Sequence, residues 1–188
     1  MARTKDPALA RQRRAQVLDA TLSLLETGSW HSTSLAAVAR EAGVSKGVVT
    51  YWFADKDELL LAAIERYHDG YAEKFAAIVN DPAPAAERLD QLLHLALPDA
   101  EHIRREVAIQ AEVRSYVKGN PDAAASLSQA YAAFRMVTAG LVALGQAEGL
   151  ITAERPGLPD MAHALIDGLT LRIAADPDAD VDLSLIHI

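Results

Sequence analysis

The stretch that decides the fold is residues 33–53, TSLAAVAREAGVSKGVVTYWF. Its spacing predicts two short helices, Leu35–Ala42 and about Lys46–Trp52, each preceded by a Ser or Thr that can cap the first turn. The link between them contains Gly43, which can take the positive φ that a tight turn needs. Two short capped helices with this link predict a helix-turn-helix.

The second helix of this pair has a surface suited to DNA. Its cap and outer face carry no acidic residue, and a carboxylate there would repel phosphates. These residues are Ser45, Lys46, Gly47, Thr50 and Tyr51. A capping box would place Glu or Gln at Val48, whose branched methyl can instead meet a thymine methyl. Val49 and Phe53 are expected to face inward. We expect helix N-termini around this motif to offer N–H groups to phosphate oxygens.

The remaining sequence predicts an all-α protein, because it contains no alternating strand pattern and shows apolar residues at helical spacing. A first helix is expected over Pro7–Thr27, with Gly28 as its C′ residue. Asp55 to Glu58 reads as a capping box for a long helix ending near Asn80. Further helices are expected at 85–97, 101–118, 121–148 and 158–175.

Composition excludes several classes of function. The 188 residues include no cysteine, so disulfides and thiolate metal sites are excluded. The six histidines have no metal-ligand spacing, and no nucleophile or phosphate-loop motif appears. We therefore expect neither an enzyme nor a bound cofactor or metal. We also expect no signal peptide, no segment long enough to span a bilayer, no membrane partner and a cytoplasmic, nucleoid-associated location.

Charge is divided unevenly along the chain. The formal net charge is -8. Residues 1–56 hold eight basic and five acidic residues, a net of +3, whereas residues 57–188 hold ten and twenty-one, a net of −11. A basic head on an acidic body indicates that only the head meets phosphates.

Residues 11–61 resemble the DNA-binding domain of the TetR family of repressors. The resemblance rests on Gly43-Val44-Ser45-Lys46-Gly47 and on the run from Tyr51 to Leu60, YWFADKDELL. It implies a three-helix DNA-binding head followed by a helical ligand-binding and dimerisation domain. Many members have tyrosine at the position of Thr50, and the small hydroxyl resembles the betaine-repressor-like branch.

The resemblance also assigns site residues. Thr33 and Ser34 are expected to contact phosphate at the start of the second helix. The residues expected to face the groove are Ser45, Lys46, Gly47, Val48, Thr50 and Tyr51. Lys56 is expected to bind a backbone phosphate, since a lysine at a helix N-terminus opposes the helix dipole and needs a partner outside the helix. Arg11, Arg13 and Arg14 fit a solvated face and phosphate contact equally well.

The expected domains are a head over 1–54 and an effector and dimer domain over 55–182. The resemblance implies that the apolar stripes at 123–147 and 161–174 pair with their copies in a homodimer that reads two half-sites. Part of each stripe is expected to supply core within the chain instead. Residues 183–188 read like a translated sequencing adapter.

Polar and aromatic residues on the later helices are candidates for a small-molecule pocket. They are Gln110, Glu112, Arg114, Tyr116, Tyr131, Phe134, Arg135 and Arg172. The arginines would suit an anionic effector. The function expected is a ligand-responsive repressor on palindromic operator DNA. The alternatives are a regulator of the same fold that activates or answers to a protein partner, and a helical enzyme or carrier that retains the head.

Overall fold

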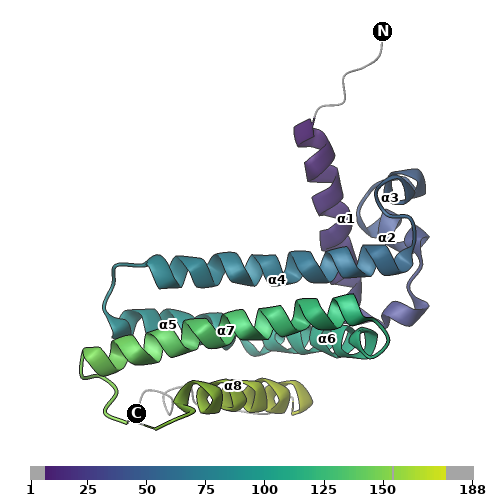
Figure 1. Cartoon of the computed structure of the whole chain (residues 1–188). Helices are drawn as coiled ribbons and strands as arrows, with labels where there is room; N and C mark the ends of the chain where they lie inside the picture. The colour runs from purple at the N-terminus through teal and green to yellow at the C-terminus, as the bar shows by residue number, and fades with distance from the viewer. Residues whose placement is uncertain (1–6, 154, 177–188) are drawn as a thin grey trace. The chain divides into compact units, whose positions relative to one another are not determined.

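The computed structural model describes residues 7–153 and 155–176. Within these ranges the chain forms α-helices and one 3-10 turn, η1, and contains no strand (Figure 1). The elements are α1 (Pro7–Thr27), η1 (Trp30–Ser32), α2 (Leu35–Glu41), α3 (Lys46–Trp52), α4 (Lys56–Asn80), α5 (Ala85–Ala96), α6 (Ala100–Val117), α7 (Pro121–Ala147) and α8 (Leu158–Ala175). The predicted all-α class is confirmed. The suspected adapter segment, 183–188, lies outside the described residues.

The chain divides into two compact units. The first comprises residues 1–69 and 108–124, and the second comprises residues 70–107 and 125–188. The predicted head, 1–54, lies within the first unit, which also takes in the first half of α4 and the C-terminal half of α6. Because α4, α6 and α7 each contribute to both units, these helices connect the units covalently.

The helix-turn-helix forms by local rules. The Ser34 hydroxyl caps α2 by accepting the Ala37 N–H at 3.2 Å. Gly43 has φ +64°, so the predicted left-handed turn residue is confirmed. Ser45 occupies the N-cap of α3 as predicted, but its side chain makes no capping hydrogen bond. Its hydroxyl is therefore not used inside the helix.

Helix α1 ends at Thr27 as predicted, and Gly28 follows it. Gly28 is not among the described glycines with positive φ, and its N–H still bonds to the Leu24 carbonyl at 3.1 Å. Gly28 therefore ends α1 without a left-handed backbone, and η1 follows at Trp30. The Ser29 hydroxyl begins that turn by accepting the His31 N–H at 3.3 Å. The sequence analysis missed η1.

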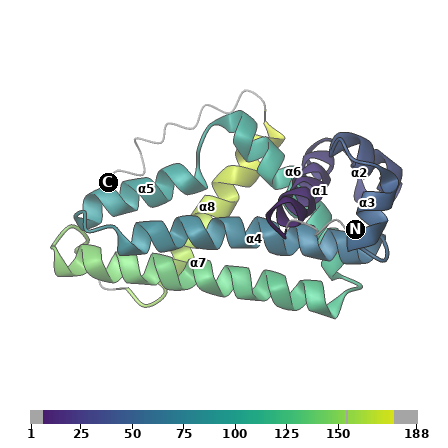
Figure 2. The same ribbon diagram turned by 90° about the horizontal axis from the view of Figure 1, so that it is seen from above.

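The second unit has two clusters of buried apolar side chains. Phe75 and Ile78 of α4 pack with Leu92 of α5 and Leu141 of α7. The other cluster joins Leu97, Ile103 and Ile173. Figure 2 shows α7 running beside the C-terminal half of α4 while α8 crosses at a steep angle. The predicted apolar stripes thus supply core within the unit.

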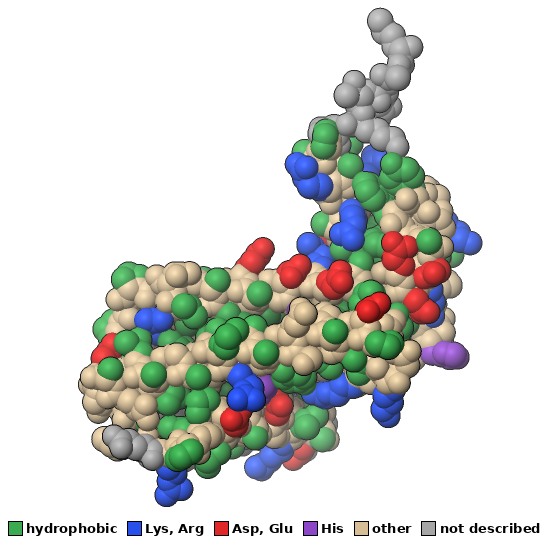
Figure 3. All heavy atoms as spheres, in the orientation of Figure 1, with side chains coloured by type: hydrophobic (Ala, Val, Ile, Leu, Met, Phe, Trp, Pro, Cys, Tyr) green, Lys and Arg blue, Asp and Glu red, His purple; other side chains and the backbone are tan. Residues whose placement is uncertain are grey.

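Helix α7 is also apolar on surfaces that this core does not use. It has the length and apolar composition of a membrane-spanning helix, with only 11% of its most apolar window buried. The expectation that no segment is long enough to span a bilayer is therefore wrong. Helix α7 passes this test because it is rich in alanine and has only two charged residues, Asp122 and Arg135. Figure 3 shows apolar side chains at several places over α7, among backbone and other atoms.

Candidate nucleic-acid interface

Helix α3 presents the predicted residues to solvent. Ser45, Lys46, Gly47, Thr50 and Tyr51 are exposed, and Val48 is half-buried. The opposite face is buried as predicted, with Val49 at 0% and Phe53 at 1% exposure. The first unit therefore carries a short helix with a polar, acid-free outer face and an apolar inner face.

Two side chains on α3 already have intramolecular contacts. The Thr50 hydroxyl donates to the Lys46 carbonyl at 3.2 Å. The Tyr51 ring is 61% exposed and lies edge-on to Trp52, with ring centroids 5.0 Å apart. The Tyr51 ring thus packs against a neighbouring ring of α3 while most of the residue stays exposed.

Both hydroxyls at the start of α2 make hydrogen bonds within the chain. Thr33 is half-buried, and its hydroxyl donates to the Ser29 carbonyl at 3.0 Å. Ser34 is exposed while it caps α2. Ser34 is thus the more accessible of the two predicted phosphate ligands.

Lys56 has a structural partner that the sequence did not reveal. Its ammonium donates to the backbone carbonyls of Trp30 and His31, the second at 3.1 Å, and lies 4.8 Å from the centroid of the Trp30 ring. Burial lowers the pKa of Lys56 below its ordinary value of 10.5. These carbonyls compensate for a cation at the N-terminus of α4. An ammonium has three donors, so one remains for a phosphate.

The first turn of α4 is capped by Asp55 and Glu58, in a variant of the predicted capping box. The Asp55 carboxylate accepts the N–H groups of Asp57 at 2.9 Å and Glu58 at 2.8 Å. The Glu58 carboxylate reaches back to the Ala54 N–H at 2.7 Å, one residue before the position that a capping box uses. The connection between α3 and α4 is therefore held from both sides.

Basic side chains also lie over the first half of α1 (Figure 3). Arg11, Arg13 and Arg14 are exposed. The guanidinium of Arg14 lies 5.3 Å from the centroid of the Phe53 ring at the end of α3. This contact places one arginine of α1 next to the end of α3.

Two residues of α6 form hydrogen bonds to the segments around the helix-turn-helix, which the sequence did not predict. A Glu112 carboxylate oxygen accepts the backbone N–H of Trp30 at 2.9 Å. The Tyr116 hydroxyl donates to the Asp57 carbonyl at 3.3 Å. Both were candidates for a pocket on residue type alone. No local pattern predicts bonds between residues so far apart in sequence.

The five principal pocket candidates are divided between the units. Gln110 donates to the Tyr67 hydroxyl at 3.0 Å in the first unit, and Arg114 of the same unit is exposed. In the second unit, Tyr131 and Phe134 both contact the His163 ring, with centroids 5.5 and 4.5 Å apart.

Arg135, the fifth candidate, is exposed and pairs with Asp160 at 3.0 Å. Phe134 further contacts Phe75, with centroids 5.2 Å apart. The aromatic candidates are therefore brought together.

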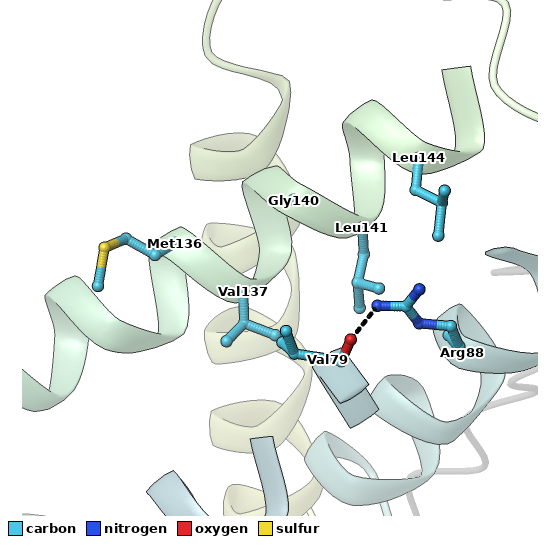
Figure 4. Close-up of a pocket in the computed structure, with 7 residues that line it drawn as sticks. All are labelled: Val79, Arg88, Met136, Val137, Gly140, Leu141 and Leu144. Atoms are coloured by element: carbon cyan, nitrogen blue, oxygen red, sulfur yellow. Dashed lines mark hydrogen bonds between the residues drawn. The ribbon is translucent and has the colours of Figure 1, made fainter. Parts of the chain in front are cut away.

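An open pocket of about 450 Å³ lies elsewhere in the second unit (Figure 4). It is lined by Val79, Arg88, Met136, Val137, Gly140, Leu141 and Leu144. None of the predicted pocket residues lines it. Its one cationic side chain, Arg88, donates to the carbonyls of Ile78 at 3.0 Å and Val79 at 2.7 Å, so it caps the end of α4.

A capped helix-turn-helix with an exposed, acid-free second helix defines a DNA-binding regulator. Residues 17–63 match the family of bacterial regulatory proteins called the tetR family, and residues 85–185 match the C-terminal domain of BetI-type transcriptional repressors. The chain belongs to the TetR family, within its BetI-like branch. Proteins of this family are transcriptional regulators and not enzymes.

Individual relatives agree with this assignment. The chain is 40% identical over 78 residues to the regulator BetI of Serratia proteamaculans, an alignment that covers 39% of each chain. It is 28% identical over 172 residues to the regulator PksA of Bacillus subtilis, covering 88% of this chain and 80% of PksA.

A crystal structure of a regulator from Saccharomonospora viridis in complex with choline is also similar. It superposes with a TM-score of 0.79 at 25% identity, covering 90% of this chain and 88% of that one.

Proposed function

We propose that this protein is a cytoplasmic repressor that binds palindromic operator DNA as a homodimer and releases it when a small molecule binds. The observation that supports it most is the outer face of α3. There, exposed Lys46 and the hydroxyls of Ser45, Thr50 and Tyr51 surround the small Gly47 with no carboxylate among them. The proposed DNA surface also includes Thr33, Ser34, Val48 and Lys56.

The exposed apolar faces of α7 and α8 support the homodimer. Met136 of α7 is 71% exposed, and Met161 and Leu165 of α8 are 57% and 55% exposed. Exposed apolar side chains of this size, gathered on two long helices, mark an interaction surface. A second copy of the chain accounts for them as well as a bilayer would, and it also supplies the second DNA-reading helix that specific binding needs.

The aromatic cluster of the second unit supports an effector with a cationic group. Tyr131 and Phe134 each contact the His163 ring, and Phe75 contacts Phe134. Ring faces attract quaternary ammonium groups, and the similar Saccharomonospora regulator holds choline. The alternative, an anionic effector bound by arginines, is less favoured because Arg135 is paired with Asp160.

The experiment is footprinting of the full-length protein on the DNA beside its own gene, with and without choline. We expect protection of an inverted repeat that choline removes at concentrations that leave a choline-insensitive TetR-type control bound. Protection without an inverted repeat would contradict the dimer. Protection that choline leaves unchanged would contradict this effector. The absence of any protection at low salt would contradict the repressor function itself.

A further inference from the structure

The C-terminal half of α6 contacts both segments that flank the helix-turn-helix. Glu112 accepts the Trp30 N–H at 2.9 Å, in the turn η1 that precedes α2. One helical turn further along α6, the Tyr116 hydroxyl donates to the Asp57 carbonyl at 3.3 Å, in the first turn of α4 after α3. Asn120 donates to the same hydroxyl at 2.7 Å and orients it. One helix therefore holds the segments that enter and leave the motif.

The contact at Trp30 is strong for its kind. Trp30 is only 7% exposed, so water is a poor substitute partner for its backbone N–H. A carboxylate acceptor makes the bond charge-assisted, which roughly doubles the strength of a neutral hydrogen bond. Removing the carboxylate would leave a buried donor unsatisfied, and that costs more than losing an exposed bond.

The same turn is also held from its other side. The carbonyls of Trp30 and His31 accept from the Lys56 ammonium of α4. Thr33, which leads into α2, donates its N–H to the Trp30 carbonyl at 3.1 Å. The peptide groups of η1 are thus fixed by α6 through an N–H and by α4 through two carbonyls, and any shift of η1 moves the start of α2.

We propose that Glu112 and Tyr116 are positioning residues for DNA binding. They do not contact DNA. They hold η1 and the first turn of α4, the two segments that flank α2 and α3. The inference rests on the proposed DNA-binding function. Residues 108–124, which include Glu112 and Tyr116, belong to the same compact unit as the head, whereas residues 100–107 of α6 belong to the second unit.

The test measures the affinity of the full-length protein for the duplex beside its own gene as salt is varied. Glu112→Ala is expected to weaken binding by about tenfold, the size expected for one charge-assisted bond. The salt dependence should stay at the wild-type slope, because no phosphate contact is lost. Glu112→Gln keeps an acceptor oxygen and should restore most of the affinity. Glu101→Ala, exposed in the first turn of α6, is the matched control and should bind as wild type.

Amide hydrogen exchange provides a second readout. Glu112→Ala should speed exchange at residues 30–34 and leave the protected amides around Val17 and Ile64 unchanged. Tyr116→Phe, which removes only a hydroxyl, should weaken binding with the same unchanged salt slope, and it replaces Glu112→Ala if that variant does not fold.

Three results would overturn the inference: wild-type affinity in both Glu112→Ala and Tyr116→Phe, an affinity loss in Glu112→Gln equal to that in Glu112→Ala, or a reduced salt slope. If wild-type protein binds no DNA, the proposed function fails and not this inference alone.

Discussion

At the scale of single residues, Lys46 and Lys56 lie in different surroundings, but both are proposed to bind DNA phosphates. Lys46 is exposed at the start of α3, whereas Lys56 already binds two carbonyls. We expect Lys46→Ala and Lys56→Ala each to reduce the salt dependence of DNA binding by about one released ion per protomer. Only Lys56→Ala should also lower the melting temperature. Lys74→Ala is the control, because Lys74 lies over the Tyr71 ring in the second unit. An unchanged slope for Lys56→Ala would limit Lys56 to its structural role.

His68 links stability to pH. Burial lowers the pKa of this imidazole below 6.5, and the neighbouring Asp69 opposes the shift only in part. The folded state therefore binds a proton less readily than the unfolded chain. The free energy of unfolding should fall as the pH drops from 6.5 through the lower folded-state pKa. Urea titrations at pH 7.5 and 5.5 measure this loss, which should shrink in His68→Gln. An equal loss in both proteins would assign it to other groups.

At the scale of elements, two glycines have opposite roles. Gly43 has φ +64° and open space where the methyl group of an alanine would lie, so Gly43→Ala meets only backbone strain. We expect it to destabilise the first unit by about 1–2 kcal/mol. Gly70 lies inside α4, also with open space around it. Gly70→Ala should stabilise by up to about 1 kcal/mol. Chemical denaturation measures both, and a stabilised Gly43→Ala variant would contradict the turn geometry.

Helix ends show what local sequence can predict. The bounds of α1, α3 and α8 agree with those predicted. Helices α2, α5 and α7 each end one residue early, and α6 both begins and ends one residue early. Ser, Pro and Gly at the ends specify these bounds through local backbone chemistry. The turn η1 escaped prediction because part of its support comes from Glu112 and Lys56, which are distant in sequence.

At the scale of the whole molecule, the proposed dimer makes a direct prediction. Met136→Glu with Leu165→Glu places charges on the exposed apolar faces of α7 and α8. We expect a folded monomer by analytical ultracentrifugation and DNA affinity lower by roughly 10²-fold or more, because two linked half-sites become one. Leu150→Glu, at a 52% exposed leucine after α7, is the control and should remain dimeric. A dimeric double variant would place the interface elsewhere.

The sequence by itself determined the helices, the turn at Gly43 and the acid-free face of α3, because capping, periodicity and left-handed backbone depend on neighbours within a few residues. Tertiary structure alone decided that Lys56 binds the carbonyls of η1, that Glu112 and Tyr116 join α6 to the head, and which side of the α8 stripe stays exposed. These outcomes depend on which helices meet in space, and contacts between distant segments leave no periodic trace in the chain.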